Sequence, residues 1–388
     1  MKAALESETE VALITGSRSD SLAGVFDLAS TGAAEQLLRQ HGMRCLECPR
    51  ASRALELALQ SARSGRSAIA IVPNRELDGS MEELGAAAAA SLDRGGAMVI
   101  VLEDDPRTCP LSCPRKACQR IDLVAIEPGD LVQLRDSIEQ SLRLSRAGRS
   151  PVAVLVHGSL LRSMDTLELR PNRIMGPSDA VAGKRRRLRS LRWSETGGFL
   201  RMARRMELNR FRAMPSPGER VSVGFVTVGP ANGAIAHLAS VLGLFSRVPV
   251  LQLGLINRVD EPAVERLLER CQQVLVLEPR PGTIEQAVLA IAEGLRRRGE
   301  VPATIWGHFV PPDADRPSAT MESDVDLHPS VLVRKISHLL HAIRPASEVV
   351  SQLVPETSAP LMTLPPRAAL IGSRAATAVL RRMATDVD

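Results

Sequence analysis

Residues 95–106, Gly95-Gly-Ala-Met-Val-Ile-Val-Leu-Glu-Asp-Asp-Pro106, indicate the fold class most clearly. A glycine pair leads into an uninterrupted apolar run, Ala97–Leu102, and acidic residues close it. A strand that is apolar at every position, rather than at every second one, is typical of a parallel sheet covered on both faces. The stretch therefore predicts a central strand of an α/β domain.

The sequence on either side repeats this strand pattern and alternates it with amphipathic helices. Five further β-rich runs are found at Val11–Thr15, Met43–Leu46, Ala68–Val72, Leu123–Ile126 and Val152–Val156. Helical patterns lie between the strands at Ala51–Ser64, Met81–Arg94 and Pro128–Arg146. We predict an α/β domain with a doubly wound, mostly parallel sheet over residues 1–172.

The remaining sequence divides into three parts. Residues 173–218 show no strand signal and are broken by prolines and glycines, so they are interpreted as a basic helical linker. Residues 219–345 repeat the alternation and predict a second, smaller α/β domain. Residues 346–388 are predicted to form a tail that contains a short helix. The strands expected in the second domain are Val221–Val228, Val248–Leu253 and Val274–Leu277, and the helices are Asn232–Leu244, Glu261–Cys271 and Thr283–Arg298.

Composition narrows the class of protein. Apolar residues make up 44% and charged residues 24% of the 388 positions, which is ordinary globular usage and argues against global disorder. No stretch approaches the roughly 20 uncharged apolar residues of a membrane-spanning helix. The acidic N-terminus does not resemble a signal peptide. We therefore expect a cytoplasmic protein without membrane partners, whose six cysteines are reduced.

Five of the cysteines are concentrated in two segments of the first domain. One segment ends the second expected strand and the other follows the fourth, so both fall at the carboxyl edge of the sheet, where such domains bind ligands. Thiolates that meet there are candidates for zinc or an iron–sulfur cluster, although reduced, partly buried cysteines are the simpler interpretation. The candidate metal ligands are Cys45, Cys48, Cys109, Cys113 and Cys118. His157, at the same edge, is interpreted as a structural histidine.

The order of segments resembles the alpha subunit of the indolepyruvate (2-oxoacid):ferredoxin oxidoreductase family, within the thiamine-diphosphate enzymes. In the first domain the resemblance rests on the Thr15–Gly16 turn, on the helix segment from Arg53 to Gly65, and on Gly95–Gly96 with its trailing Asp-Asp-Pro. The resemblance implies a pyrimidine-binding domain there and a transketolase C-terminal-like domain after it. The matching segments of the second domain begin at Gly224, Val248 and Val274.

The resemblance also predicts which residues should contact the cofactor, and this sequence departs from it. Thr15, Gly16, Ser17 and Glu47 are the candidate cofactor-binding residues. The family activates thiamine diphosphate with a glutamate at the start of the helix after strand two, and the matching position here is Ser52. We therefore assign no catalytic residue in this chain.

The family's diphosphate-binding domain is also expected to be missing. The sequence contains no Gly-Asp-Gly turn followed by an asparagine, which would hold Mg²⁺ and the diphosphate. The resemblance thus covers the two front domains. Thiamine diphosphate and Mg²⁺ are expected only if a separate thiamine-binding or ferredoxin-linked subunit supplies that domain. A homodimer or a hetero-oligomer is expected.

Two functions remain open at this point. The chain is a component of a 2-oxoacid:ferredoxin oxidoreductase that is inactive alone, or it is a non-catalytic pseudoenzyme that acts as a metal-binding or scaffold protein through its cysteine-lined cleft. A nucleic-acid role is weaker. Lys184–Arg212 holds eleven basic residues against two acidic ones, but aromatic residues, which would stack on bases, amount to 2% of the chain.

Overall fold

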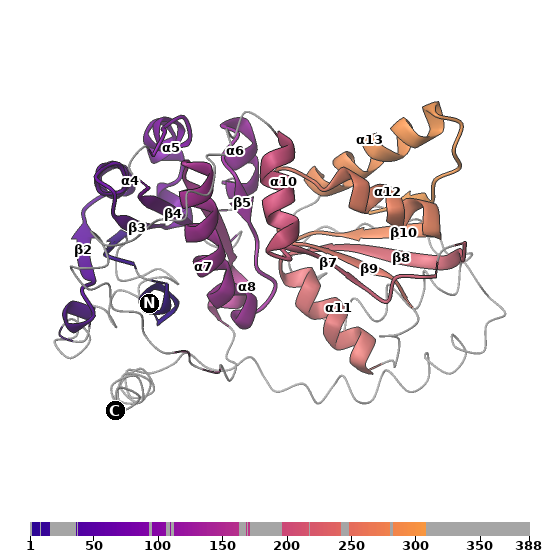
Figure 1. Ribbon diagram of the computed structural model, residues 1–388, viewed down its shortest axis with the longest axis horizontal. Coiled ribbons are helices and arrows are strands. Elements are labelled where there is room, and N and C mark those ends of the chain that lie inside the picture. Colours follow the sequence, from indigo (N-terminus) through magenta and orange to yellow (C-terminus); the bar gives the residue numbers. More distant parts are fainter. Residues whose placement is uncertain are drawn as a thin grey trace. The chain divides into compact units, whose positions relative to one another are not determined.

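The computed structural model describes two compact α/β units, divided between Met206 and Glu207. Figure 1 shows the chain, and each unit is described by itself below. The described residues are 2–7, 9–15, 36, 38–92, 95–105, 109, 112–162, 168, 170, 196–216, 218–241, 248–279 and 282–307. Of the predicted segments, most of the linker and the whole tail at 346–388 lie outside these ranges.

The first unit is built on a six-stranded sheet of order β2-β1-β3-β4-β6-β5, in which every neighbouring pair of strands is parallel. Such an order requires a crossover between strands, and the helices make these crossovers. The predicted doubly wound parallel sheet is confirmed. Its strands are β1 (Val11–Thr15), β2 (Arg44–Cys48), β3 (Ser67–Val72), β4 (Ala97–Asp104), β5 (Ala125–Ile126) and β6 (Val152–His157).

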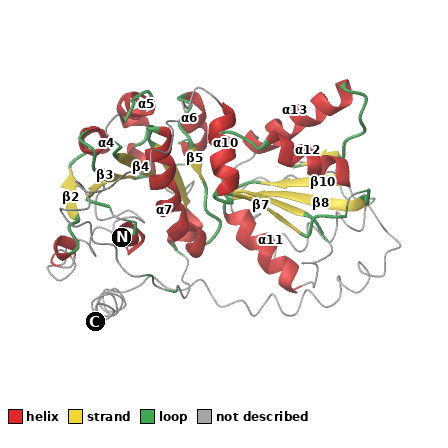
Figure 2. Ribbon diagram, viewed as in Figure 1, coloured by secondary structure: helices red, strands yellow, loops and turns green. Residues whose placement is uncertain are grey.

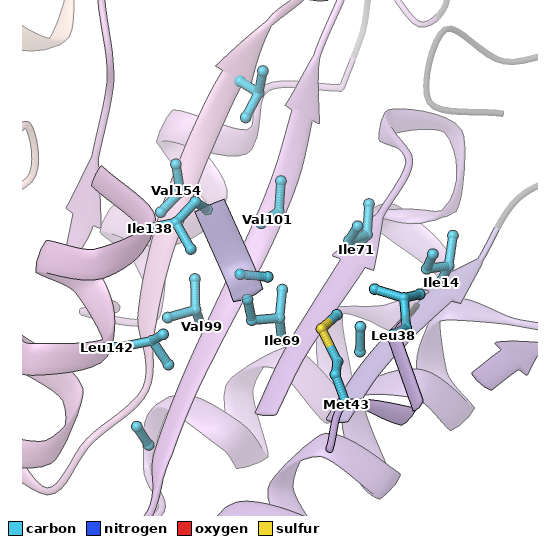
Figure 3. Packing of buried hydrophobic residues seen from close by; sticks show 14 of the residues in the cluster. Ile14, Leu38, Met43, Ile69, Ile71, Val99, Val101, Ile138, Leu142 and Val154 are labelled. Atoms are coloured by element: carbon cyan, nitrogen blue, oxygen red, sulfur yellow. The ribbon is translucent and has the colours of Figure 1, made fainter. Parts of the chain in front are cut away.

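Helices cover both faces of this sheet (Figure 2). On one face, α1 and α7 pack on residues that alternate along the strands, such as Ile69 and Ile71 of β3 and Val99 and Val101 of β4 (Figure 3). On the other face of the sheet, α4 packs against β1 and β3. Because both faces are covered, every residue of β1, β3, β4 and β6 is buried. The helices are α1 (Lys2–Glu6), α4 (Ala51–Arg63), α5 (Met81–Ala88), α6 (Pro114–Arg120), α7 (Leu131–Gly148), α8 (Gly158–Leu161) and α10 (Thr196–Arg205).

The long helix α7 has clear sequence signals at both ends. At its start the Asp130 carboxylate accepts a hydrogen bond from Gln133 N at 2.7 Å, which satisfies one of the free N–H groups of the first turn. At its end Arg149 takes the left-handed conformation, with φ of 56°. The helix therefore begins three residues later than the sequence predicts and ends two residues later.

The second unit holds a five-stranded mixed sheet of order β11-β10-β8-β9-β7, and β7 is its antiparallel member. Figure 1 shows α11 on one side of this sheet and α12 and α13 on the other. The predicted second, smaller α/β domain is confirmed. Its elements are β7 (Asn209–Arg212), β8 (Val221–Val228), α11 (Pro230–Val241), β9 (Val250–Leu253), α12 (Glu261–Arg270), β10 (Cys271–Leu277), α13 (Thr283–Arg297) and β11 (Thr304–Trp306).

Strand β7 corrects one prediction, since residues 173–218 were expected to contain no strand. It pairs with β9 at the edge of the sheet, where Phe211 lies opposite Leu251. The Arg266 guanidinium lies 5.2 Å from the centre of the Phe211 ring. The four residues Asn-Arg-Phe-Arg alternate between half-buried and exposed, and a short polar edge strand gives a weak signal in sequence.

Candidate functional site

Of the four residues predicted to contact a cofactor, two are described. Thr15 ends β1 and is buried, and its hydroxyl donates to the carbonyl oxygen of Ile71 at 2.8 Å. That bond ties β1 to the neighbouring β3. Glu47 is exposed on the edge strand β2. Gly16 and Ser17 lie outside the described residues. Thr15 and Glu47 thus lie on two paired strands, one buried and one exposed.

Ser52 lies in the first turn of α4, as the sequence predicts, but a carboxylate reaches this turn from elsewhere. Glu76 belongs to the 3₁₀ turn η1 (Asn74–Glu76) after β3, and its Oε2 accepts a hydrogen bond from Ala51 N at 2.6 Å. The residue before the helix, Arg50, makes no side-chain cap. Glu76 therefore satisfies one of the free N–H groups at the start of α4.

The two other carboxylates near Ser52 in sequence, Glu56 and Glu47, lie elsewhere and are exposed. Glu56 pairs with Arg53 at 2.8 Å, and about half of each side chain is exposed. Glu47, on β2, is exposed as well. Neither hydrogen bonds at the start of α4 in the contacts described for these residues. The candidate carboxylate at this position is therefore Glu76, which could not be selected from the sequence because it follows a different strand.

Replacing Glu76 by alanine is expected to lower the free energy of unfolding by about 1 kcal/mol, because α4 loses its cap. Urea unfolding of the first unit measures the change. Glu56→Ala is the matched control, since it removes an exposed carboxylate of the same length and should change stability by no more than about 0.5 kcal/mol. Equal effects of the two substitutions would show that the Glu76 bond does not cap α4.

The five candidate metal ligands do not form a site in the described part of the chain. There, no group of three or more His, Cys, Asp or Glu side chains is placed to hold a metal ion. The second cysteine segment, which follows β4, contains the helix α6, with Pro114 in its first turn and Cys113 as its N-cap residue. Cys118 belongs to that helix and is fully buried.

The thiols also differ in burial and in pKa. Burial raises the pKa of the Cys48, Cys118 and Cys271 thiols, and that of Cys271 reaches about 12. The thiolate is the form that binds metals and reacts, so these three groups are held in their inert form. Cys45, Cys109 and Cys113 are half-buried.

We expect an aromatic disulfide reagent to modify Cys45, Cys109 and Cys113 in the native protein within minutes. The three buried cysteines should react only after unfolding in denaturant, because their thiols are both inaccessible and neutral. Absorbance counts the modified thiols and peptide mass spectrometry locates them. Rapid native modification of Cys118 would contradict the burial described for it.

A different set of polar side chains is gathered at the carboxyl edge of β4, β6 and β5. Asp104 ends β4, His157 ends β6, and Glu127 follows β5, so three adjacent strands each deliver a titratable group. Asp104 and His157 are register partners. All three side chains are almost completely buried. Sequence reasoning treated His157 alone and passed over the two carboxylates.

An internal ion pair holds this cluster. The guanidinium of Arg115, from α6, donates to Glu127 Oε2 at 2.6 Å, and both side chains are 1% exposed. Burial raises the pKa of Glu127 above its ordinary value of 4.5, whereas the Arg115 charge lowers it and the Asp104 charge raises it again. The raised pKa means that the folded state binds this proton more tightly. Its contribution to stability therefore declines as pH rises above 4.5.

A second group of polar contacts lies beside it at the end of β4. Asn74 N donates to Glu103 Oε2 at 3.1 Å, and Asn74 Nδ2 donates to the Asp105 carbonyl at 3.2 Å. The Asp105 carboxylate pairs with Arg162 at 2.6 Å. Glu103, Asp104 and Asp105 are thus all buried in a row. The acidic residues that end and follow β4 are therefore buried together at the carboxyl edge of the sheet, where Glu103 and Asp105 make these polar contacts.

The fold of the chain is similar to that of two solved structures. The chain is similar to 2-oxoglutarate:ferredoxin oxidoreductase from Magnetococcus marinus, with a TM-score of 0.50 and 12% identity over 79% of this chain. It spans 60% of that protein's length. It is also similar to a split-gene transketolase described as an inactive beta4 tetramer, with a TM-score of 0.51, 11% identity and coverage of 89% of this chain and 94% of that one.

No protein-family profile and no curated protein sequence matches the chain. The likeness therefore shows the fold. Within the described ranges, no helix is both long and apolar enough to cross a membrane.

Proposed function

We propose that this chain is a component of a thiamine-diphosphate-dependent 2-oxoacid:ferredoxin oxidoreductase and does not activate the cofactor by itself. The observation that supports a component of this class is the likeness in fold to 2-oxoglutarate:ferredoxin oxidoreductase over 79% of this chain. A separate subunit would bind the diphosphate and Mg²⁺. The indolepyruvate type of substrate rests on the sequence resemblance described above.

The described residues do not fit the activation of thiamine diphosphate. That chemistry needs a carboxylate directed at the aminopyrimidine from the start of α4. Ser52 has none, and Glu76 Oε2 already accepts a hydrogen bond from Ala51 N. The hydroxyl of Thr15 is likewise used between β1 and β3. We therefore derive no step through the cofactor in this chain.

These same observations favour the alternative, a non-catalytic relative that serves as a scaffold. A scaffold needs the two folded units and has no use for a carboxylate at Ser52. The metal-binding form of this alternative has weaker support, because three of the six thiols are buried with raised pKa values. The two proposals differ in whether an associated complex oxidises 2-oxoacids.

Cofactor activation can be tested on the purified full chain. The measurement is exchange of the thiazolium C2 proton of thiamine diphosphate with deuterium, followed by NMR in the presence of Mg²⁺. We expect the chain to leave the exchange rate of the free cofactor unchanged, because Ser52 carries no carboxylate and the one described carboxylate that reaches the start of α4, Glu76, is bonded to Ala51 N. An acceleration of about tenfold or more that is lost in Glu76→Gln would overturn this and assign the activating role to Glu76.

A further inference from the structure

A row of polar side chains crosses the sheet of the second unit near the carboxyl end of β8. Thr227 of β8 pairs in register with Gln252 of β9, and Gln252 pairs in register with Arg210 of β7. Register partners on neighbouring strands direct their side chains to the same face of a sheet. Thr227, Gln252 and Arg210 therefore lie side by side on one face.

The first turn of α11 lies over this face. The Thr227 hydroxyl donates to Asn232 Oδ1 at 2.6 Å, and Asn232 belongs to that turn. The opposite face packs against α12, because a Cβ atom at Gly224, on the other side of β8 from the Thr227 side chain, would lie 3.3 Å from Leu267 of that helix. The polar row and Asn232 thus form one group on the α11 face.

Two buried amides of this group have hydrogen-bonding capacity that the protein does not use. Gln252 is 5% exposed, and its side-chain amide has no hydrogen-bond partner among the residues that the structure describes. Asn232 is 2% exposed, and within the same ranges only its oxygen is bonded, so Nδ2 has no acceptor. Buried polar groups in folded proteins almost always have partners. These two amides therefore indicate a bound molecule that supplies the partners.

The charge around the row favours an anion over ordered water. Arg210 lies at the exposed end of the row, where its Nε donates to the Glu207 carbonyl at 2.8 Å and its guanidinium forms no ion pair within the described ranges. Helix α11 contains no acidic residue, and its N-terminus lies at the same edge with the partial positive charge of free N–H groups. Donors beside an arginine and a helix N-terminus suit an oxyanion.

The position of the group in the fold also favours a ligand. The order β11-β10-β8-β9-β7 places β9, which follows α11, and β10, which follows α12, on opposite sides of β8. Figure 1 shows these two helices on opposite faces of the sheet. The strand order therefore reverses at β8. Open α/β sheets bind ligands outside the carboxyl ends of their strands at such a reversal.

We propose that this group binds a small anion through a carboxylate or phosphate group. The oxyanion accepts hydrogen bonds from Gln252 Nε2 and Asn232 Nδ2, and Arg210 provides the opposite charge at the exposed end of the row. Binding involves no covalent step and is independent of the oxidoreductase role. Carboxylates and phosphates share this chemistry, so the two are compared directly in the experiment.

The experiment is isothermal titration calorimetry of the full chain with inorganic phosphate and, separately, with malonate, at an ionic strength held constant with sodium chloride. We expect one of the two anions to bind saturably at one site per chain, with a dissociation constant of about 1 mM or below. The tighter of the two identifies the group that the site accepts. Gln252→Leu should weaken binding about tenfold or more, because a hydrogen bond to a charged group is lost. It should not lower the Tm, since the amide has no partner in the protein.

Arg210→Gln is expected to weaken binding about tenfold or more as well, through loss of a charge-assisted contact. Arg266→Gln is the matched control. Arg266 is also exposed and lies over the Phe211 ring, on the opposite face of β7 from Arg210, so its replacement should leave the affinity unchanged. Equal losses in the two arginine variants would show a general effect of charge and would overturn the proposal.

The unchanged protein alone can refute the site. If neither anion binds saturably at concentrations up to about 10 mM, the proposal is overturned. It is overturned equally if a folded Gln252→Leu or Arg210→Gln protein binds with the original affinity, because the anion then lies elsewhere. Arg210 is exposed, so its variant decides the question if Gln252→Leu does not fold. Thermal unfolding without either anion shows which variants are folded.

Discussion

Replacing Arg115 by alanine is expected to lower the free energy of unfolding by about 3–5 kcal/mol. The substitution leaves the Glu127 carboxylate buried without the guanidinium that binds its Oε2 at 2.6 Å. The remaining oxygen, Oε1, has no hydrogen-bond partner among the described residues that could compensate. Urea unfolding monitored by far-ultraviolet circular dichroism measures the loss.

The pH dependence separates this explanation from a simple loss of packing. Without Arg115, the pKa of Glu127 rises further, because one of the causes that lower it is gone. Burying a protonated Glu127 side chain costs little free energy, whereas burying an ionised one without a partner costs much more. The destabilisation should therefore be larger at about pH 8 than at about pH 5. A pH-independent loss would contradict the ion-pair account.

A double substitution provides the control. Arg115→Met together with Glu127→Leu removes both charges and keeps apolar volume, so it should recover most of the lost stability. If the double variant is as unstable as Arg115→Ala, the site depends on the shape of the arginine rather than on its charge.

Replacing Gly96 by alanine is expected to destabilise the first unit by about 3 kcal/mol or more, at the upper end of the cost of overpacking. An added Cβ would collide with the backbone carbonyl of Ala62 at the end of α4, and would lie 2.9 Å from the carbonyl oxygen of Arg66. These atoms belong to the backbone and cannot rotate away. The loss is measured by thermal and urea unfolding of the full chain.

Gly85→Ala is the matched control for this prediction. Gly85 lies inside α5, and the nearest atom to its added Cβ is Ile121 Cγ2, at 3.9 Å. There the substitution should raise stability by about 0.5–1 kcal/mol, because alanine is the better helix former. If Gly96→Ala proves as harmless as Gly85→Ala, α4 does not approach β4 as closely as described.

The fold could be predicted from the sequence because its strands are buried on both faces. All six predicted strands of the first unit are present, and β4 runs two residues beyond the predicted Leu102. The elements that were missed carry weaker signals. Helix α6 has seven residues within a segment rich in proline and cysteine, and β11 has three residues. Short elements of this kind depend on tertiary packing rather than on their own pattern.

The candidate site was less predictable, because its contacts join residues far apart in sequence. Ser52 could be located from its place at the start of α4. The Glu76 carboxylate that reaches the same turn could not, since the bond to Ala51 N spans 25 residues and depends on how η1 lies beside α4. The pairing of Arg115 with Glu127 was hidden for a similar reason. It depends on α6, the helix that the sequence did not reveal.

The most direct test of the proposed function is to isolate the chain from its native host with whatever remains bound to it, and to assay oxidation of 2-oxoacids. We expect activity in a complex that contains a second, thiamine-diphosphate-binding subunit, and none in the chain separated from that complex. Oxidation of a 2-oxoacid by the separated chain would contradict the account. A complex that retains the chain and the cofactor but oxidises no 2-oxoacid would contradict it equally and favour the scaffold.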